Sequence, residues 1–261
     1  MKAKKSLGQN FLINKGTLNK IINAANIEPN DHVIEIGPGH GVLTKELVKQ
    51  AKNVTTIELD DRLIPELEET FKDTSNIKIC HQDALDFTPP KTPYKLVANI
   101  PYYITSPILN HFLREQPQKQ RPTHLVLLVQ REVAQKICAS DGDLSVLALQ
   151  VQLFGKPKII TKVPPTHFRP APKVDSAILR ITPHAPLIQD KDIPSFFTLI
   201  HAGFAHKRKK LIRNLEKIPN ITKETLNPLF ESLNLDSNIR AQELTLTDWL
   251  NLLRELTKTM N

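Results

Sequence analysis

Short apolar runs alternate with amphipathic segments along the first half of the chain. Five runs are expected to form strands: HVIEIG (32–37), NVTTIEL (53–59), NIKICH (76–81), YKLVANI (94–100) and THLVLLVQ (123–130). All but the third are rich in Val, Ile and Leu, which is typical of strands buried on both faces of a parallel sheet. Helix-like segments such as GVLTKELVKQA (41–51) and DRLIPELEETFK (61–72) lie between them. This alternation predicts an α/β protein with a doubly wound, mostly parallel sheet and right-handed crossovers.

Two further apolar runs follow, and then the pattern changes. PKIITKVP (157–164) and SAILRIT (176–182) are joined by a Pro-rich connection. We expect them to add antiparallel strands at one edge of the sheet. PHAPLIQDKDIP (183–194) is typical of a linker, and the remainder is helical and basic. The sequence therefore predicts two domains, residues 1–182 and a small helical domain of residues 183–261.

Composition adds the size and charge of the protein. The chain has 261 residues, of which 40% are hydrophobic, enough for a sizeable core. No stretch approaches the ~18 uncharged apolar residues of a membrane span. The start, MKAKKSLGQNFL, lacks the apolar run of a signal peptide, so a cytoplasmic protein without membrane association is expected. A net charge of +8 and a pI near 9.4 make a nucleic-acid partner a fair hypothesis, and an ordinary basic soluble protein stays open.

The cysteine pattern argues against a disulfide-rich or zinc-binding class. Cys80 and Cys138 lie far apart in the sequence. They fit a reducing compartment and buried thiols better than a disulfide. His81 beside Cys80 lacks the spacing of a ligand pair, so we expect no metal site.

Three glycines directly follow the first predicted strand. They are Gly37, Gly39 and Gly41, in VIEIGPGHGVLT. Glycines at such a turn let the backbone turn tightly and approach a ligand closely. The dinucleotide fingerprint G-x-G-x-x-G has its third glycine where this chain has Val42. The turn therefore favours a cofactor with no pyrophosphate, and Gly37 and Gly39 are candidate cofactor-binding residues.

Carboxylates end the next two predicted strands. Glu58 lies 21 residues after Gly37, and Asp83 follows the third strand in HQDALDF. An acid at the end of the second strand accepts hydrogen bonds from ribose hydroxyls. We expect Asp83 to bind an adenine amine. Since the carboxyl ends of strands form the ligand edge of an open α/β sheet, the set predicts S-adenosyl-L-methionine as the cofactor.

The stretch VANIPYYITSP places a candidate catalytic group at the same edge. Asn99 ends the fourth strand and is followed by Ile100, Pro101 and Tyr102. The Asn99 side-chain oxygen and a backbone carbonyl near Ile100 are expected to accept hydrogen bonds from the two N–H groups of an adenine amine. These two hydrogen bonds would aim the nitrogen lone pair at a methyl carbon. Such acceptors must be held in place before the reaction. Pro101 stiffens the loop, and Tyr102 is expected to stack on the target base, a contact of ~1–3 kcal/mol.

Two segments outside the sheet complete the pattern. The N-terminal arm, SLGQNFLIN (residues 6–14), has amides ahead of Phe11 and Leu12 and is expected to cover the cofactor. One helix is predicted around SFFTLIHAGFAHKRKKLIRNL (195–215), with an apolar stripe and basic residues directed away from it. We expect five of these to contact RNA phosphates: Lys207, Arg208, Lys209, Lys210 and Arg213.

Over nearly its whole length the sequence resembles the KsgA-type ribosomal RNA small-subunit adenine N6,N6-dimethyltransferases. The matching motifs are KKSLGQNFL, EIGPGHGVLT, IELD, QDAL, NIPYYITSPIL, LVQREVA, LSVL, PPTHFRPAPKVDSAIL, GFAHKRKKLIRNL and RAQELTL. The resemblance implies a Rossmann-like class I methyltransferase sheet. It places cofactor contacts on Asn10, Leu12, Gly37, Glu58, Asp83 and Asn99. It places the target-base pocket on Asn99, Ile100, Pro101, Tyr102 and Phe168.

The resemblance also implies a reaction and a partner. The family converts two adjacent adenosines, in a hairpin loop near the 3′ end of small-subunit rRNA, to N6,N6-dimethyladenosine. We therefore expect a role in ribosome biogenesis, a pre-30S-type particle as substrate, and a monomeric enzyme. Tyr103 departs from the small polar residue that is frequent in the family, and the segment from Ala139 to Leu144 is shorter than usual.

Three other functions stay open at this stage. An Erm-like methyltransferase acting on large-subunit rRNA shares the catalytic half, but its C-terminal part is not expected to resemble GFAHKRKKLIRNL. A nucleic-acid-binding assembly or transcription factor on the same fold needs no catalysis, which the set of Gly37, Glu58, Asp83 and Asn99 argues against. A nicotinamide oxidoreductase is disfavoured by Val42 and by the Asn-Ile-Pro-Tyr stretch.

Overall fold

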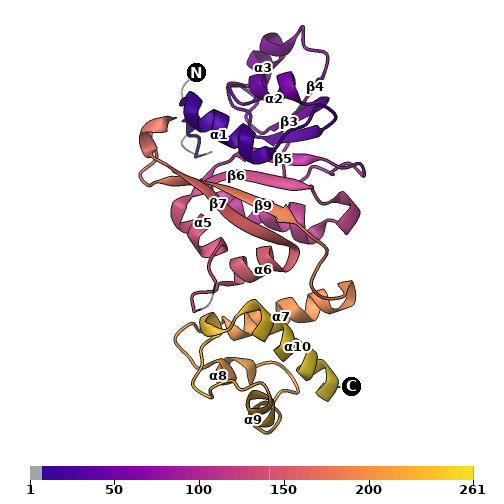
Figure 1. Ribbon diagram of the computed structural model, residues 1–261, viewed down its shortest axis with the longest axis vertical. Helices are drawn as coiled ribbons and strands as arrows, with labels where there is room; N and C mark the ends of the chain where they lie inside the picture. Colours follow the sequence, from indigo (N-terminus) through magenta and orange to yellow (C-terminus); the bar gives the residue numbers. More distant parts are fainter. Residues whose placement is uncertain (1–7, 141, 261) are drawn as a thin grey trace. The chain divides into compact units, whose positions relative to one another are not determined.

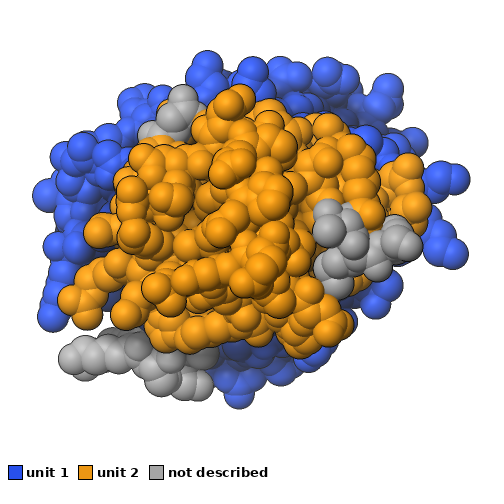
Figure 2. Space-filling model, turned by 90° about the horizontal axis from the view of Figure 1, so that it is seen from below, with its two compact units in different colours: residues 1–135, 155–185 blue, residues 136–154, 186–261 orange. Residues whose placement is uncertain are grey.

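The protein forms two compact units in a computed structural model that describes residues 8–140 and 142–260 (Figure 1). Unit 1 consists of residues 1–135 and 155–185, and unit 2 of residues 136–154 and 186–261, as coloured in Figure 2. Both units are thus built from two chain segments, whereas the sequence predicts a single boundary at 182/183. The difference arises because residues 136–154 cluster with the C-terminal segment.

Unit 1 contains a seven-stranded sheet in the order β4-β3-β2-β5-β6-β9-β7. Its strands are β2 (His32–Ile36), β3 (Asn53–Glu58), β4 (Ile77–His81), β5 (Lys95–Asn99), β6 (His124–Gln130), β7 (Gly155–Val163) and β9 (Ser176–Pro183). The first five pair in parallel, and β9 pairs antiparallel with β6 and β7. The predicted mostly parallel sheet with an antiparallel edge is therefore confirmed.

Burial along the strands follows their places in the sheet. In the central strand β2 all residues after His32 are buried, whereas no residue of the edge strand β4 is fully buried. The edge position explains why the third predicted strand is less apolar than the others. It also corrects the expectation of buried thiols, because Cys80 on β4 is half-buried, as is Cys138. The other edge, β7, shifts its register against β9 between Ile159 and Thr161.

The helices between the strands cover the sheet. They are α1 (Lys15–Ala25), α2 (Thr44–Gln50), α3 (Ile64–Phe71), α4 (Thr105–Leu109), a π-helix (Asn110–Glu115) and α5 (Arg131–Ile137). Ile21 and Leu18 of α1 share a buried cluster with Val33, Val97 and Val126 of the sheet. Helix α1 begins where the Asn14 side chain accepts a hydrogen bond from the backbone of Thr17, so the residue just before the helix satisfies one of its orphan donors.

A second, two-stranded sheet joins the N-terminal arm to the rest of unit 1. Strand β1 (Phe11–Leu12) pairs antiparallel with β8 (Phe168–Arg169). The backbone N–H of Ile13 adds a 2.9 Å hydrogen bond to the carbonyl of His167. The arm is therefore part of the fold from residue 8 onward. Lys2, Lys4 and Lys5, the basic residues at the start of the sequence and further candidates for RNA contact, lie outside the described residues.

Unit 2 is helical. Its helices include α6 (Val146–Phe154), α7 (Ile193–Gly203), α8 (Leu211–Leu215), α9 (Lys223–Ser232) and α10 (Leu246–Met260). Trp249 of α10 is fully buried and stacks on Phe204 with ring centroids 5.7 Å apart. Leu144, from the short segment after α5, donates a backbone hydrogen bond to Gln242 within this unit.

The single helix predicted over residues 195–215 is wrong. Helix α7 ends at Gly203, and α8 begins only at Leu211. The buried Asn214 amide donates hydrogen bonds to the carbonyls of Gly203, at 2.6 Å, and His206, at 3.1 Å. The first bond satisfies a carbonyl at the end of α7, which a helix terminus leaves without a partner, and the second adds to the bond that the His206 carbonyl accepts from the N–H of Lys209. Asn214 thereby stabilises the turn over residues 204–210.

Gly203 provides a test of packing in unit 2. A Cβ added there would lie 2.4 Å from Cη2 of Trp249 and 3.0 Å from Cδ1 of Leu211. Gly203→Ala should therefore lower the free energy of unfolding by about 1–3 kcal/mol through overpacking. Trp249 is the chain's one tryptophan, so denaturant unfolding followed by its fluorescence measures the loss. Ser195→Ala, on an exposed position of α7, is the control, and equal stability of the two variants would contradict the packing argument.

Candidate functional site

A cavity of about 420 Å³ lies in unit 1 at the carboxyl ends of β2, β3, β4 and β5. Its volume is in the range of small-molecule sites, ~300–1,000 Å³. The cavity brings together every predicted catalytic and cofactor-binding residue: Asn10, Leu12, Gly37, Gly39, Glu58, Asp83, Asn99, Ile100, Pro101, Tyr102 and Phe168. Residues far apart in the sequence therefore share one concave site at the edge where open α/β sheets bind ligands.

The glycine turn lines the cavity. Gly37 and Gly39 have φ values of +68° and +59°, a backbone conformation that L side chains rarely adopt. A Cβ on Gly39 would lie 2.9 Å from Cδ1 of Phe11. Position 39 therefore has to be glycine for two reasons, its backbone conformation and the close approach of the N-terminal arm.

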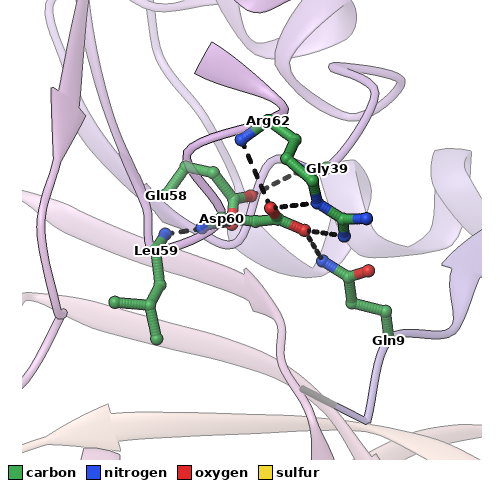
Figure 3. A network of polar contacts seen from close by, with 6 residues as sticks. All are labelled: Gln9, Gly39, Glu58, Leu59, Asp60 and Arg62. Carbon is green, nitrogen blue, oxygen red and sulfur yellow. Dashed lines mark hydrogen bonds and ion pairs between the residues drawn. The ribbon is translucent and has the colours of Figure 1, made fainter. Parts of the chain in front are cut away.

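Glu58 is held by backbone donors at the end of β3 (Figure 3). Its Oε1 accepts hydrogen bonds from the N–H groups of Leu59 and Asp60, both at 2.9 Å, and its Oε2 accepts one from Gly39 at 3.2 Å. Burial raises the pKa of Glu58, and these three hydrogen bonds oppose that rise. The carboxyl group is thereby fixed beside the glycine turn, with a defined orientation toward the cavity.

Glu35 on β2 also lines the cavity and is 1% exposed. Its Oε2 accepts a 2.6 Å hydrogen bond from the buried Thr44 hydroxyl. Burial, with a smaller contribution from the charge of Glu58, raises the pKa of Glu35 to about 8. The group is therefore mostly neutral at pH 7. The sequence predicts a strand buried on both faces at this position, but it did not mark Glu35 as part of the site.

Asp83 and Asn99 lie on opposite sides of the central strand β2. Asp83 is half-buried after β4, and its Oδ1 accepts a 2.9 Å hydrogen bond from the N–H of Leu85. Asn99 ends β5, and its Nδ2 donates to the backbone carbonyl of Asn10 at 3.2 Å. An amide has one donating and one accepting branch, so this bond leaves Oδ1 as the accepting branch of Asn99.

Aromatic rings form the wall next to Asn99. The Tyr102 hydroxyl is 2.7 Å from Oγ of the fully buried Ser176, which holds the ring at the cavity, and burial raises the Tyr102 pKa. Phe168, on β8, is 3% exposed. Tyr103 also lines the cavity but is 61% exposed, so it lies at the mouth. The arrangement fits a flat aromatic ring held against Tyr102.

An ion pair between Asp60 and Arg62 at this edge was not predicted. Asp60 is 1% exposed, and its carboxylate accepts hydrogen bonds from Arg62 Nε at 2.8 Å and from Arg62 Nη2 at 2.5 Å. The side chain of Gln9 in the N-terminal arm also donates to Asp60, at 2.8 Å (Figure 3). The acidic residues of IELDDR mark this position as polar in the sequence. They do not indicate that Asp60 bonds to Gln9, 51 positions earlier.

The five predicted RNA-binding residues are exposed in unit 2. Lys207 to Lys210 lie in the turn between α7 and α8, and Arg213 lies on α8. The Lys210 ammonium donates to the Asn238 side chain. These residues therefore present a basic turn, not the predicted face of one continuous helix.

Two kinds of feature are absent from residues 8–140 and 142–260. No helix in these ranges is long and apolar enough to cross a membrane. The same residues contain no group of three or more His, Cys, Asp or Glu side chains that could hold a metal ion.

The strand order, the antiparallel β9 and the glycine turn define a Rossmann-like class I methyltransferase. Comparison with known proteins then identifies the family. The chain matches the family "Ribosomal RNA adenine dimethylase" over residues 1–258. It belongs to that family.

Known proteins of similar sequence and structure agree with this. The chain is 42% identical over 261 residues to "Ribosomal RNA small subunit methyltransferase A" of Dehalococcoides mccartyi, covering 98% of this chain and 89% of that protein. A dimethyladenosine transferase from Plasmodium falciparum superposes with a TM-score of 0.83 at 31% identity, covering 96% of this chain and 98% of the other. The 23S rRNA methyltransferase ErmE superposes with a TM-score of 0.78 at 29% identity, covering 95% and 100%.

Replacing Glu35 tests the buried carboxyl. Because its pKa of about 8 in the folded chain lies above the ordinary 4.5, the folded chain keeps a proton that the unfolded chain releases. The stability that Glu35 contributes is present below the ordinary pKa and is lost as the pH rises toward 8, by at most about 1.4 kcal/mol per pH unit. Glu35→Gln keeps an acceptor for Thr44 without titrating, so it should gain stability over wild type across that window.

Urea unfolding of wild type and Glu35→Gln at several pH values between the two pKa values measures this gain. Glu68→Gln, at an exposed position of α3, serves as the control. A stability difference between Glu35→Gln and wild type that does not change with pH would contradict a neutral, buried Glu35.

Proposed function

We propose that this protein transfers methyl groups from S-adenosyl-L-methionine to N6 of two adjacent adenosines near the 3′ end of small-subunit rRNA, giving N6,N6-dimethyladenosines. The family and the relatives named as small-subunit methyltransferases support the reaction. One structural observation carries the proposal: a single cavity combines carboxylates suited to an adenosine with the Asn99–Tyr102 segment suited to a second adenine.

The residues at the ends of β2, β3 and β4 fit the cofactor. The carboxylate of Glu58 would accept hydrogen bonds from the ribose hydroxyls, and Asp83 would accept one from the adenine amine. Gly37 and Gly39 leave room for the ligand because they have no side chain. Asn10 and Leu12 of the N-terminal arm would contact the cofactor from the other side. When bound, S-adenosyl-L-methionine supplies a methyl group on a positively charged sulfur.

The residues at the end of β5 fit the acceptor base. Oδ1 of Asn99 and a backbone carbonyl near Ile100 would accept hydrogen bonds from the two N6–H groups. These bonds would aim the nitrogen lone pair at the methyl group. Pro101 restricts the backbone at this point. Tyr102 and Phe168 would hold the adenine ring from its faces. The base has to leave its stack to enter, which costs least for a loop nucleotide.

The basic turn of unit 2 is proposed to bind the RNA backbone. Its five residues are exposed and positively charged, as phosphate contacts require. The substrate would be a pre-30S-type particle and the enzyme a monomer in the cytoplasm. These statements rest on the resemblance and on the charge of unit 2.

An Erm-like activity on large-subunit rRNA is the second candidate, because ErmE superposes over 95% of this chain. The two candidates differ in the RNA that accepts the methyl group. Small- and large-subunit particles are incubated with radiolabelled S-adenosyl-L-methionine, and rRNA nucleosides from cells with and without the protein are compared by mass spectrometry. Label in the large-subunit RNA alone would overturn the proposal.

Asn99→Ala tests the proposed chemistry. The variant should lower kcat by about 10²-fold or more, the scale for loss of one preorganised polar contact, while affinity for the RNA particle stays near wild type. The assay is run at saturating cofactor, because Asn99 is also placed near the cofactor. Asn19→Ala, on the exposed face of α1, is the control. Turnover of Asn99→Ala at the wild-type rate would exclude the proposed role.

Charge reversal of Lys209, Lys210 and Arg213 tests the RNA surface. Each lost phosphate contact should reduce the slope of log affinity against log salt by ~0.7–0.9 and weaken binding. Affinity for S-adenosyl-L-methionine should not change, because the cavity is formed by unit 1 alone. Binding to small-subunit particles is measured at several salt concentrations.

The matched control reverses Lys20, Lys52 and Lys223, which are exposed elsewhere, so that both variants have the same net charge. If both variants lose the same affinity and slope, the effect comes from net charge, and the basic turn has no special role.

A further inference from the structure

The N-terminal arm crosses the cavity and is attached to unit 1 at three places. Gln9 bonds to Asp60 beyond the end of β3, Asn10 bonds to Asn99 at the end of β5, and Leu12 pairs with Phe168 of β8. The arm therefore contacts both the proposed cofactor end and the proposed base end of the site.

The contact at Gln9 has a preformed acceptor. Asp60 is buried, and the Arg62 guanidinium holds its carboxylate through two hydrogen bonds, of which the one from Nη2 is also an ion pair. Hydrogen bonds from Arg62, above all, lower the pKa of Asp60, so the acceptor is ionised. A hydrogen bond from the Gln9 amide to an ionised, pre-oriented carboxylate is stronger than one between neutral groups. This bond fixes the arm one residue before Asn10.

The contact at Asn10 determines how the catalytic amide is oriented. The backbone carbonyl of Asn10 accepts from Nδ2 of Asn99 at 3.2 Å. Because the amide is planar, holding its nitrogen also sets the direction of Oδ1. The proposed chemistry needs Oδ1 as an acceptor for an N6 hydrogen. If the Asn10 carbonyl moved away, the Asn99 amide would be free to rotate and present a donor instead.

The contact at Leu12 leaves little freedom on the other side of Asn10. Leu12 and Phe11 form the ladder with β8, and the N–H of Ile13 bonds to the His167 carbonyl. The Asn10 carbonyl is therefore held between a two-residue ladder on its C-terminal side and the Gln9–Asp60 bond on its N-terminal side.

We infer that Gln9 and Asp60 are positioning residues for methyl transfer: their hydrogen bond holds the N-terminal arm so that the Asn10 carbonyl orients the Asn99 amide toward the acceptor base. The inference rests on the proposed function and adds two residues to it. Both act through Asn10 and Asn99, without contact to the reacting atoms. It predicts an effect on turnover that is separable from the affinity for the cofactor.

Gln9→Ala separates these two effects. At saturating S-adenosyl-L-methionine and saturating small-subunit particles, kcat should fall about tenfold or more, as expected for a lost hydrogen bond to a charged group. The dissociation constant for the cofactor, measured by calorimetry, should rise as well, because Asn10 and Leu12 lie on the same arm, and saturation removes that effect from kcat. Gln50→Ala, exposed at the end of α2, is the matched control and should behave like wild type. A weakened cofactor affinity with wild-type kcat at saturation would overturn the inference.

A double-mutant comparison tests the route through Asn99. Asn99→Asp keeps an oxygen acceptor but loses the Nδ2 donor to Asn10, so Gln9→Ala should cost little further in that background. An equal fold-loss in both backgrounds would show that Gln9 acts elsewhere and would also overturn the inference. Where Asn99→Asp is too slow to measure, the kcat and affinity results for Gln9→Ala decide the question alone. A wild-type protein that transfers no methyl group would instead refute the proposed function.

Discussion

The parallel, in-register pairing of β2 with β3 and β5 is the constraint on which the rest of the site depends. Ile36 of β2 pairs with Ile57 of β3 and Ala98 of β5, so the three strands end at the same level. The residues that follow, Gly37, Glu58 and Asn99, therefore meet at one edge. The 2.9 Å hydrogen bond from the N–H of Gly37 to the Ile57 carbonyl extends the ladder into the turn and fixes where the glycine backbone faces the cavity.

Much of this edge could be predicted because its signals are local. Apolar runs marked the strands, and the last polar residue of each run, such as Glu58 or Asn99, marked the ligand edge. The break between α7 and α8 could not be predicted, since the Asn214 side chain that stabilises it comes from 11 residues beyond Gly203. The β1–β8 ladder, which joins segments far apart in the sequence, was unreadable for the same reason.

Two buried glutamates, Glu35 and Glu58, line the cavity at this edge of the sheet. Glu35 and Glu58 both lose solvation, but only Glu58 gains three backbone donors in return. The result is two carboxyl groups of different character within one cavity, one mostly neutral and one held in place for hydrogen bonding. Similar separation of neighbouring acids by their environments recurs at catalytic sites. In the sequence Glu35 and Glu58 are the same residue type. The difference between their carboxyl groups arises from the structure, in which Thr44 contacts Glu35 and the glycine turn contacts Glu58.

The outer strand β7 has consequences for association between molecules. One side of β7 is unpaired in the described sheet, and such an edge can recruit a strand from another chain. The strand contains Pro157, which has no backbone donor, and it carries Lys156, Lys158 and Lys162. Its register shift also interrupts the regular ladder. Proline, lysine and an irregular ladder are the means by which natural sheets resist edge-to-edge aggregation. We therefore expect this edge strand to resist the addition of a strand from another molecule.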